Sequence, residues 1–349
     1  MAELTLGHVT KRFGDVTAVD DVTLDVHDGE FVALLGPSGC GKTTILRLIA
    51  GFESVSAGEI GFDGELMSAV TRHVPPERRR VGIVFQSYAL WPHMSVGANI
   101  GYPLRVANIA GEEYRSKVDT ALETVGLTGL ESRRPADLSG GQRQRVALAR
   151  CLVMEPSLVL LDEPLANLDV HLRAAMEEEF VDFHKTTGAT MLYITHDQAE
   201  AMALADRVAV MNDGRLVQVA DPRTLYEEPA TAMVADFIGR GVVMPGLVTR
   251  VDGHGSCEVE ICGERVELRC TRQQSPGPAS LSLRPEFLDL APSGIEGRVQ
   301  RVVYRGGIHD VEVVLSRLPR HALVLNCVEA PSPGADVHVR VRGGWVIPG

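Results

Sequence analysis

One segment of the chain fits the phosphate-binding pattern GxxxxGK(S/T), and it runs through Gly36, Pro37, Ser38, Gly39, Cys40, Gly41, Lys42 and Thr43. Glycines let backbone N–H groups wrap around a phosphate without a clash from a Cβ atom. Lys42 is expected to reach the β- and γ-phosphates of a nucleotide, and Thr43 to offer a hydroxyl to Mg²⁺. Cys40 is interpreted as a small side chain that fills the loop, and the adjacent Thr44 is included among the nucleotide-binding residues.

The flanks of this segment decide between a phosphate loop and a glycine-rich turn that contains Lys-Thr by chance. Phe31 to Leu35 is a short apolar run typical of a buried strand, and Thr43 to Ala50 has helical spacing of apolar residues. A helix that begins at the loop adds its positive end to the anion site. The order strand, loop, helix therefore favours the phosphate loop.

Further apolar runs follow at Val81 to Phe85, Leu158 to Leu161, Thr190 to Ile194 and Arg207 to Met211, with helical patterns such as Glu112 to Val125 between them. Strands that alternate with helices predict an α/β fold in which helices cover both faces of a parallel sheet. Ligands of such sheets bind beyond the carboxyl ends of the strands. We therefore expect the residues that follow each run to form the site.

Polar residues do follow these runs: Gln86, Asp162, Glu163 and His196. Adjacent strand residues point to opposite faces, so Asp162 can hold Mg²⁺ while Glu163 acts as general base toward the attacking water. An apolar run followed by acids is also typical of a helix N-terminus. A histidine in this position is often a buried structural residue, and a glutamine is often an ordinary loop residue.

A second anion-binding segment is predicted at Leu138, Ser139, Gly140, Gly141 and Gln142, directly before the helical run Arg143 to Val153. Ser139 and the glycines would aim N–H groups and a helix terminus at an anion. The alternative is an ordinary helix start in which Ser139 is the N-cap.

The order of phosphate loop, Leu-Ser-Gly-Gly-Gln and Asp-Glu strand resembles that of ATP-binding cassette (ABC) ATPases, and the resemblance covers essentially the whole chain. It implies a P-loop NTPase fold with a helical subdomain at about residues 87–155. Gln86 matches the Q-loop glutamine, which contacts Mg²⁺ or water, and His196 matches the switch histidine, which binds the γ-phosphate. Phe13 takes the place of an aromatic that stacks on adenine, with a core role as the alternative. Leu165 to Asp169 matches the D-loop, so Asp169 is included among the nucleotide-binding residues.

The resemblance also implies partners. In this family each ATP lies between the loop of one subunit and the signature segment of another, and Leu138 to Gln142 matches that segment in this chain. A homodimer with two composite sites is therefore expected. Two transmembrane permease subunits and, indirectly, a solute-binding protein complete such a transporter. The aromatic stretch Tyr88 to Pro92 is either core or part of a groove that receives a helix of a permease subunit.

The pattern changes near Gly239, so the chain is divided into an ATP-binding domain at 1–238 and a β domain at 239–349. Short alternating segments predict a small barrel or sandwich; they are Gly246 to Val251, Cys257 to Ile261, Ser280 to Leu283, Gly297 to Tyr304, Asp310 to Leu315, Ala322 to Asn326 and Val337 to Val341. Phe237-Ile238-Gly239, Arg284-Pro285-Glu286 and Tyr304-Arg305-Gly306-Gly307 resemble importer ATPase subunits with a C-terminal OB-like (TOBE) domain. Such importers carry sugars, polyamines, ferric iron, sulfate or phosphonates, and Ser87 to Val96 resembles the iron and polyamine branch.

Charge and hydropathy limit the remaining classes. The balance of 46 acidic to 34 basic residues, a net charge of −12, is unusual for a nucleic-acid binder. No run approaches the ~18–20 apolar residues of a membrane helix, and Met1 to Thr10 has no signal-peptide core. We therefore expect a peripheral protein on the cytoplasmic side of the inner membrane, where ATP hydrolysis energises import. The alternatives are a soluble ABC ATPase of translation or DNA repair, and a subunit whose C-terminal domain is also a regulatory binding module.

Overall fold

The computed structural model describes residues 3–166 and 170–349, and the chain forms two compact units, Met1–Pro222 and Arg223–Gly349. The division between the two units therefore falls earlier in the sequence than the predicted boundary between residues 238 and 239. The helix α9 (Ala232–Phe237) packs within the second unit because Arg284 donates hydrogen bonds to the carbonyl oxygens of Ala235 and Ile238. How far the ATP-binding domain extends along the chain stays a prediction.

A mixed sheet with the strand order β11-β10-β3-β9-β8-β7 forms the centre of the first unit. Its strands are β3 (Phe31–Leu35), β7 (Val81–Val84), β8 (Leu158–Asp162), β9 (Thr190–Thr195), β10 (Arg207–Asn212) and β11 (Arg215–Ala220). All neighbours pair in parallel except β10 and β11, which form an antiparallel hairpin. The predicted α/β class is confirmed, and each of the apolar runs named above forms one of these strands.

A second, antiparallel sheet has the strand order β2-β1-β4-β5-β6. Its strands are β1 (Leu4–Phe13), β2 (Val16–Val26), β4 (Ala57–Phe62), β5 (Glu65–Ala69) and β6 (Arg72–His73). The hairpin of β4 and β5 is absent from the sequence-based expectation because glycines interrupt its alternating pattern. Gly58 and Gly64 both have positive φ angles, and an added Cβ at Gly58 would collide with the carbonyl oxygen of His8.

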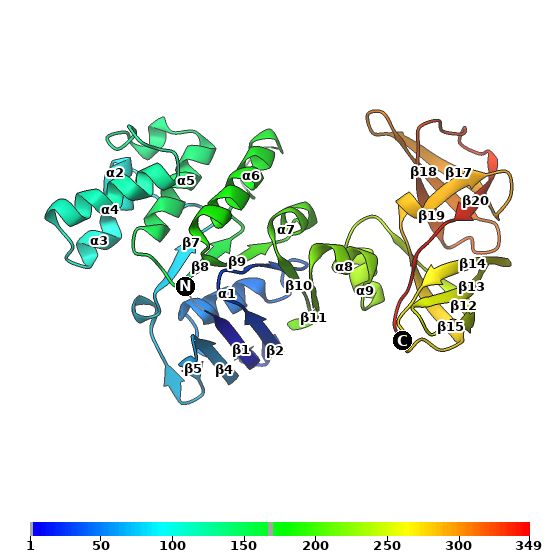
Figure 1. Ribbon diagram of the computed structural model, residues 1–349, viewed down its shortest axis with the longest axis horizontal. Coiled ribbons are helices and arrows are strands. Elements are labelled where there is room, and N and C mark those ends of the chain that lie inside the picture. The colour runs from blue at the N-terminus through cyan, green and yellow to red at the C-terminus, as the bar shows by residue number, and fades with distance from the viewer. Residues whose placement is uncertain (1–2, 167–169) are drawn as a thin grey trace. The chain divides into compact units, whose positions relative to one another are not determined.

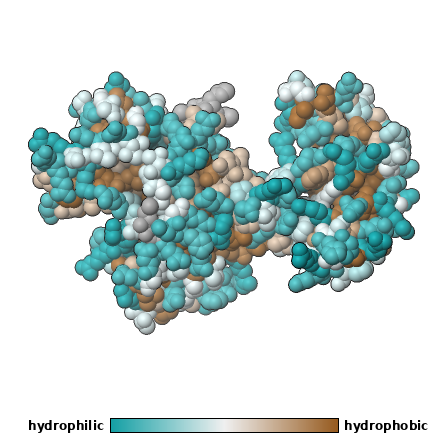
Figure 2. Space-filling view, in the orientation of Figure 1, coloured by the Kyte–Doolittle hydropathy of each residue, from teal (hydrophilic) through white to brown (hydrophobic). Residues whose placement is uncertain are grey.

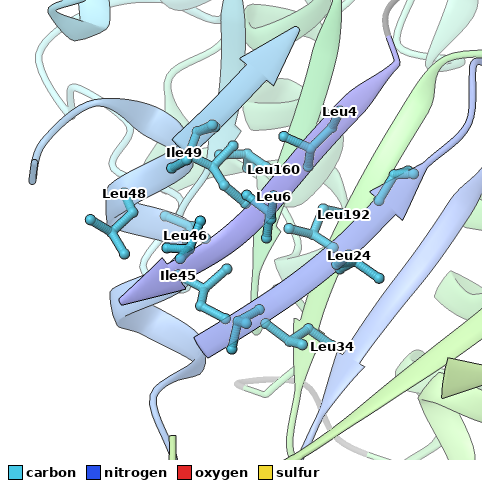
Figure 3. Close-up of a cluster of buried hydrophobic side chains, with 14 of the residues drawn as sticks. Leu4, Leu6, Leu24, Leu34, Ile45, Leu46, Leu48, Ile49, Leu160 and Leu192 are labelled. Atoms are coloured by element: carbon cyan, nitrogen blue, oxygen red, sulfur yellow. The ribbon is translucent and has the colours of Figure 1, made fainter. Parts of the chain in front are cut away.

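Helix α1 (Lys42–Ala50) packs with residues of both sheets in one core. Figure 3 shows Ile45, Leu46, Leu48 and Ile49 of α1 close to leucines of both sheets, and all four side chains are buried. Burial of apolar side chains on this scale is the main favourable term in folding. The helix that follows the phosphate loop is thus held in the middle of the core.

The opposite face of the parallel sheet is covered by helices α6 (Val170–Thr187) and α7 (Gln198–Leu204). Aromatic rings join these layers, because Tyr193 of β9 contacts Phe31 of β3 and Phe180 of α6 with centroid distances of 5.9 and 6.1 Å. Offset and edge-to-face ring pairs of this kind add stability beyond the apolar area that they bury.

Four helices form a subdomain with its own core: α2 (Val96–Ile100), α3 (Tyr102–Val106), α4 (Gly111–Thr124) and α5 (Gly140–Leu152). Figure 1 shows them as a cyan and green group, and α5 joins this group to the parallel sheet through its contact with β7. Asn99 is fully buried there, accepts a hydrogen bond from the Trp91 N–H and donates to the carbonyl oxygens of Trp91 and Ser95. A buried amide with all these partners fixes the chain segment that enters the subdomain.

The second unit is an all-β domain with a closed barrel, in the order β12-β13-β14-β21-β15, and a sheet in the order β16-β20-β17-β18-β19. The strands are β12 (Val242–Val251), β13 (Ser256–Ile261), β14 (Glu264–Arg269), β15 (Gly277–Leu283), β16 (Leu288–Ala291), β17 (Ile295–Tyr304), β18 (His309–Leu315), β19 (Ala322–Cys327), β20 (Asp336–Val341) and β21 (Trp345–Val346). Barrel and sheet share one apolar core. The small all-β class is confirmed, although β14, β16 and β21 are absent from the expected strands.

Arg79 links α1 to the antiparallel sheet. Its guanidinium is 2% exposed and donates to the carbonyl oxygens of Leu48 and Ile49, at the end of α1, and of Val74, at 2.7, 2.8 and 2.7 Å. Burial lowers the pKa of Arg79 to about 10, which leaves the group charged at neutral pH. It therefore acts as a buried C-terminal cap of the helix.

We predict that Arg79→Met lowers the free energy of unfolding by about 2–5 kcal/mol, because each buried acceptor that loses its partner costs about 1–3 kcal/mol. Urea unfolding followed by circular dichroism measures the difference. The exposed neighbour Arg78, replaced by Met in the same way, is the control and should stay within about 0.5 kcal/mol of the wild type. Equal stability of the two variants would contradict the capping role.

Candidate nucleotide-binding and hydrolysis site

The parallel register brings the predicted site residues to one edge of the sheet. Leu35 of β3 pairs with Thr195 of β9, and Asp162 of β8 pairs with Ile194 of β9. The phosphate loop, the Asp-Glu pair and His196 therefore follow neighbouring strands at the same level. Gln86 lies just beyond the end of β7, which pairs in parallel with β8, and its side chain is exposed.

The phosphate loop has little room for side chains at two of its glycines. A Cβ at Gly36 would lie 2.7 Å from the Cys40 sulfur and would collide with the carbonyl oxygen of Met211. Gly41 has a φ of 109° at the N-cap of α1, and no side chain caps that helix. The N–H groups of the first turn are thus left for a ligand, as an anion site at a helix start requires. Cys40 is buried and fills the loop, as expected.

Lys42 turns back into the loop that precedes it. Its side chain is 6% exposed, and Nζ donates to the carbonyl oxygens of Gly36 and Pro37 at 2.7 and 3.0 Å. A buried ammonium held by two neutral carbonyls has no anionic partner in either contact. Phosphate oxygens would supply that partner, so the loop suits the β- and γ-phosphates. The remaining loop residues are open to a ligand: Ser38, Gly39 and Thr43 are exposed, and Pro37 and Thr44 are half-buried.

The two carboxylates at the end of β8 have different environments. Burial, and then the neighbouring charge of Glu163, raise the pKa of Asp162, whereas Lys42 lowers it. A half-buried carboxylate of this kind gains from a cation, because the cation offsets the cost of burying a negative charge. Asp162 therefore fits a Mg²⁺ ligand, as does the exposed hydroxyl of Thr43, since Mg²⁺ prefers oxygen ligands.

Glu163 leaves the strand direction. Its φ is 45°, in the left-handed region that non-glycine residues rarely occupy, and its N–H donates to the Ile194 carbonyl at 2.9 Å. This turn places Glu163 Oε1 3.2 Å from His196 Nδ1. Backbone strain that surrounding structure holds in place is frequent at active sites. The structure thus brings Glu163 and His196 together, and both side chains remain partly open to solvent.

Arg150 ties the segment after Gln86 to α5, the helix that begins at the signature segment, and the sequence pattern did not predict this role. Arg150 of α5 donates to the carbonyl oxygens of Tyr88 and Ala89 at 2.8 and 2.7 Å, and its guanidinium lies 4.9 Å from the Trp91 ring centroid. Tyr88 and Ala89 both have positive φ angles. Tyr88 is buried, which agrees with the core alternative for that residue, whereas Trp91 is half-exposed. An arginine in the last turn of a helix is a weak sequence signal for such a contact, because most arginines in this position are exposed to solvent.

Ser139 is the N-cap of α5, so the helix-cap alternative describes its place in the single chain. Its Oγ accepts from the Gln142 N–H at 3.2 Å, and the Gln142 side chain accepts from the Ser139 N–H at 3.0 Å. This reciprocal capping box orients the first turn of α5, where Gly140 is half-buried and Gly141 is buried. Leu138 of this segment packs in the core of the helical subdomain, whereas Cys40 of the phosphate loop packs in the core of the two sheets.

Two further candidates differ in what the structure says of them. The Phe13 ring is 47% exposed at the end of β1, with Lys11 Nζ 4.8 Å from its centroid, so it is not a core residue. Its stacking on adenine stays a prediction. Asp169 lies outside the described residues, as do Asn167 and Leu168, so the D-loop assignment also stays a prediction.

The comparisons with known families agree with this geometry. The chain matches the family model "ABC transporter" over residues 19–166 and the model "TOBE domain" over residues 281–347. The solved structure of cbiO1 from Clostridium perfringens, part of the ABC transporter complex cbiONQ, is similar at a TM-score of 0.59 and 31% identity, covering 64% of this chain and 89% of that chain.

Curated relatives match along nearly the full length. The spermidine/putrescine import ATP-binding protein PotA of Pseudomonas aeruginosa is 46% identical over 352 residues, which cover 98% of this chain and 96% of the relative. PotA of Rubrobacter xylanophilus is 48% identical over 307 residues, 86% of this chain and 80% of the relative. The Fe(3+) ions import ATP-binding protein FbpC 1 of Rhizobium meliloti is 44% identical over 310 residues, 88% and 86% of the two chains.

A phosphate loop at the centre of a parallel sheet, a signature helix and a C-terminal β domain together define a cassette-type ATPase. The chain belongs to the ABC transporter family, as the ATP-binding subunit of an importer. The expected family, the ATPase activity that energises import and the TOBE domain are thereby confirmed.

We predict that Lys42→Ala weakens ATP binding about 10- to 100-fold, because a hydrogen bond to a charged group contributes about 1.5–3 kcal/mol. Titration with a fluorescent ATP analogue measures the Kd. The exposed Lys185 of α6, replaced by Ala, is the control for loss of one positive charge and should bind as the wild type does. An unchanged Kd in Lys42→Ala would rule out the assigned contact with the phosphates.

Proposed function

We propose that two copies of this chain close over two ATP molecules and that Glu163 is the general base of hydrolysis. The observation that carries the proposal is the pairing of Glu163 Oε1 with His196 Nδ1 at 3.2 Å, at the sheet edge where the phosphate loop begins. A carboxylate held in a strained backbone and open to solvent can take a proton from a water molecule beside the γ-phosphate.

Three residues of the chain would hold Mg²⁺ with the nucleotide: Thr43, Gln86 and Asp162. The raised pKa of Asp162, caused first by its burial, supports a cation at this position. When bound, Mg²⁺ neutralises charge that develops on the β- and γ-phosphate oxygens.

The other residues orient the reactants and stabilise charge. Lys42 and the N–H groups at the start of α1 bind the phosphates, Phe13 stacks on the adenine, and His196 binds the γ-phosphate on the side of the attacking water. Glu163 orients that water and accepts its proton, so the hydroxide forms only where the phosphorus can be attacked. Removal of such a base typically costs about 10²–10⁴-fold in rate.

The second half of each site comes from another copy of the chain. Ser139, Gly140 and Gly141 form an anion-binding helix start in the helical subdomain, while the phosphate loop belongs to the sheet core. A symmetric homodimer pairs each loop with the partner's signature segment and makes two equal sites. Asp169 would lie near the same interface, as the family resemblance implies.

Membrane subunits are the further partners that we infer. No helix in residues 3–166 and 170–349 has both the length and the apolar character for a membrane crossing. We place the protein peripherally, on the cytoplasmic side of the inner membrane, against two permease subunits that receive solute from a binding protein. Figure 2 shows hydrophobic areas on the surface of the helical subdomain, and Tyr102 and Val106 are among its exposed apolar residues. A permease helix would contact this region.

The substrate that we propose is a polyamine, with ferric iron as the second candidate. The support is the names of relatives, since PotA proteins of Pseudomonas and Rubrobacter are spermidine/putrescine import proteins and FbpC 1 of Rhizobium is an Fe(3+) import protein. Deletion of the gene should lower uptake of radiolabelled spermidine and leave uptake of iron-55 unchanged. The reverse pattern would support iron, and unchanged uptake of both would refute both substrates.

We predict that Glu163→Gln binds ATP normally, hydrolyses it about 10²–10⁴-fold more slowly and accumulates as closed dimers with Mg·ATP, because the amide cannot accept the proton. Size-exclusion chromatography with light scattering measures the dimer, and phosphate release measures turnover. Glu178→Gln on α6 is the control with an exposed carboxylate. Turnover at the wild-type rate in Glu163→Gln would remove this residue from the role of base.

A further inference from the structure

Glu200 is a buried carboxylate four residues after His196 in the chain. Among the described residues, none of its hydrogen bonds goes to the phosphate loop. Glu200 of α7 is 3% exposed, and one of its oxygens, Oε2, accepts hydrogen bonds from two hydroxyls. The donors are Thr195 Oγ1 at 2.7 Å and Tyr193 Oη at 2.8 Å. Charge-assisted O–H···O⁻ bonds of this length are strong, and they fix both side chains of β9 against the first turn of α7.

The contacts of Glu200 reach both neighbours of His196. Thr195 precedes His196, and its Oγ1 also accepts from the Asp197 N–H at 2.9 Å. Asp197 follows His196 and caps α7 by accepting from the Ala199 N–H at 2.8 Å. The backbone on either side of His196 is therefore held through one hydroxyl that Glu200 orients.

Arg173 joins this cluster to α6. Its Nη1 donates to Asp197 Oδ2 at 3.0 Å, and its Nε lies 3.8 Å from Glu200 Oε1. The same charges act on the nearby Glu177. Burial, and then the charges of Glu200 and Asp197, raise the pKa of Glu177, whereas Arg173 lowers it. The cluster thus holds several acids around one cation, and Arg173 stands in the first turn of the helix that follows Glu163 in the chain.

We propose that Glu200, acting through Thr195, is a positioning residue that holds His196 at hydrogen-bonding distance from Glu163. The inference rests on the proposed roles of Glu163 and His196 in hydrolysis. His196 has a half-exposed side chain, so packing alone does not fix its direction. The hydroxyl of Thr195 sets the backbone from which His196 projects, and a shift of about 1 Å at a reacting group can cost about 100-fold in rate.

Two hydroxyls on the same carboxylate oxygen give a matched pair of variants. Thr195→Val removes the hydroxyl beside His196, and Tyr193→Phe removes the hydroxyl two residues farther away while keeping the buried ring. Each variant deletes one hydrogen bond to Glu200, so a general loss of stability affects both. Only Thr195→Val frees the backbone that carries His196.

The expected result for Thr195→Val in the full-length chain is a kcat for ATP lowered about 10- to 100-fold, with a KM within about twofold of the wild type. Tyr193→Phe should keep kcat within about twofold, at a thermal midpoint similar to that of Thr195→Val. Thr195→Ser retains the hydroxyl and should restore kcat. If the valine does not fold, Thr195→Ala removes the same hydroxyl without adding bulk.

Glu163→Gln and His196→Ala, assayed in parallel, separate the proposed function of the site from the positioning role of Glu200 and Thr195. If both retain wild-type turnover, the proposed function of the site fails. If both lose turnover, the proposed function stands. The positioning role of Glu200 and Thr195 is then overturned if Thr195→Val and Thr195→Ala have the kcat of the wild type or that of Tyr193→Phe.

Discussion

The lateral register of the parallel strands is the constraint on which the site depends. The apolar strands β3, β8 and β9 are buried on both faces, so a slip of one residue would turn a polar end residue into the core. The register Leu35 to Thr195 and Asp162 to Ile194 therefore follows from burial, and with it the level at which the loop, the carboxylates and His196 emerge. Residues that lie far apart in the sequence meet because hydrophobic strands align, and no contact between the polar groups themselves is needed to bring them together.

The charged groups of the site lie close together but have different surroundings. Lys42 sits among backbone carbonyls, Asp162 is half-buried beside it, and Glu163 is turned away by a left-handed backbone toward His196. A phosphate group, a cation and a water molecule each have a group of matching charge or hydrogen-bonding character. The strain at Glu163 persists because the Ile194 carbonyl and the surrounding buried strands hold the turn.

The sequence predicted what depends on local pattern and missed what depends on tertiary contact. The loop, the strand ends and the capping serine at 139 have local signatures, because glycines, apolar runs and helix caps act over a few residues. The β4 and β5 hairpin escaped notice because its glycines disturb the alternation, and the short strands β14, β16 and β21 offer too few residues for a pattern. Arg79, Arg150 and Glu200 could not be assigned, because a charged residue in a sequence reads as solvent-exposed until a fold surrounds it with carbonyls or hydroxyls.

The capping box at the start of α5 has a consequence for the chemistry of association. A serine hydroxyl has one proton and two lone pairs, and the bond from the Gln142 N–H occupies a lone pair only. The proton of Ser139 is thus free to rotate toward an oxygen supplied by another molecule while the cap stays in place. Binding of an anion to this hydroxyl would break no internal hydrogen bond. The start of the helix is already in its bound conformation, so little conformational entropy would be lost on binding.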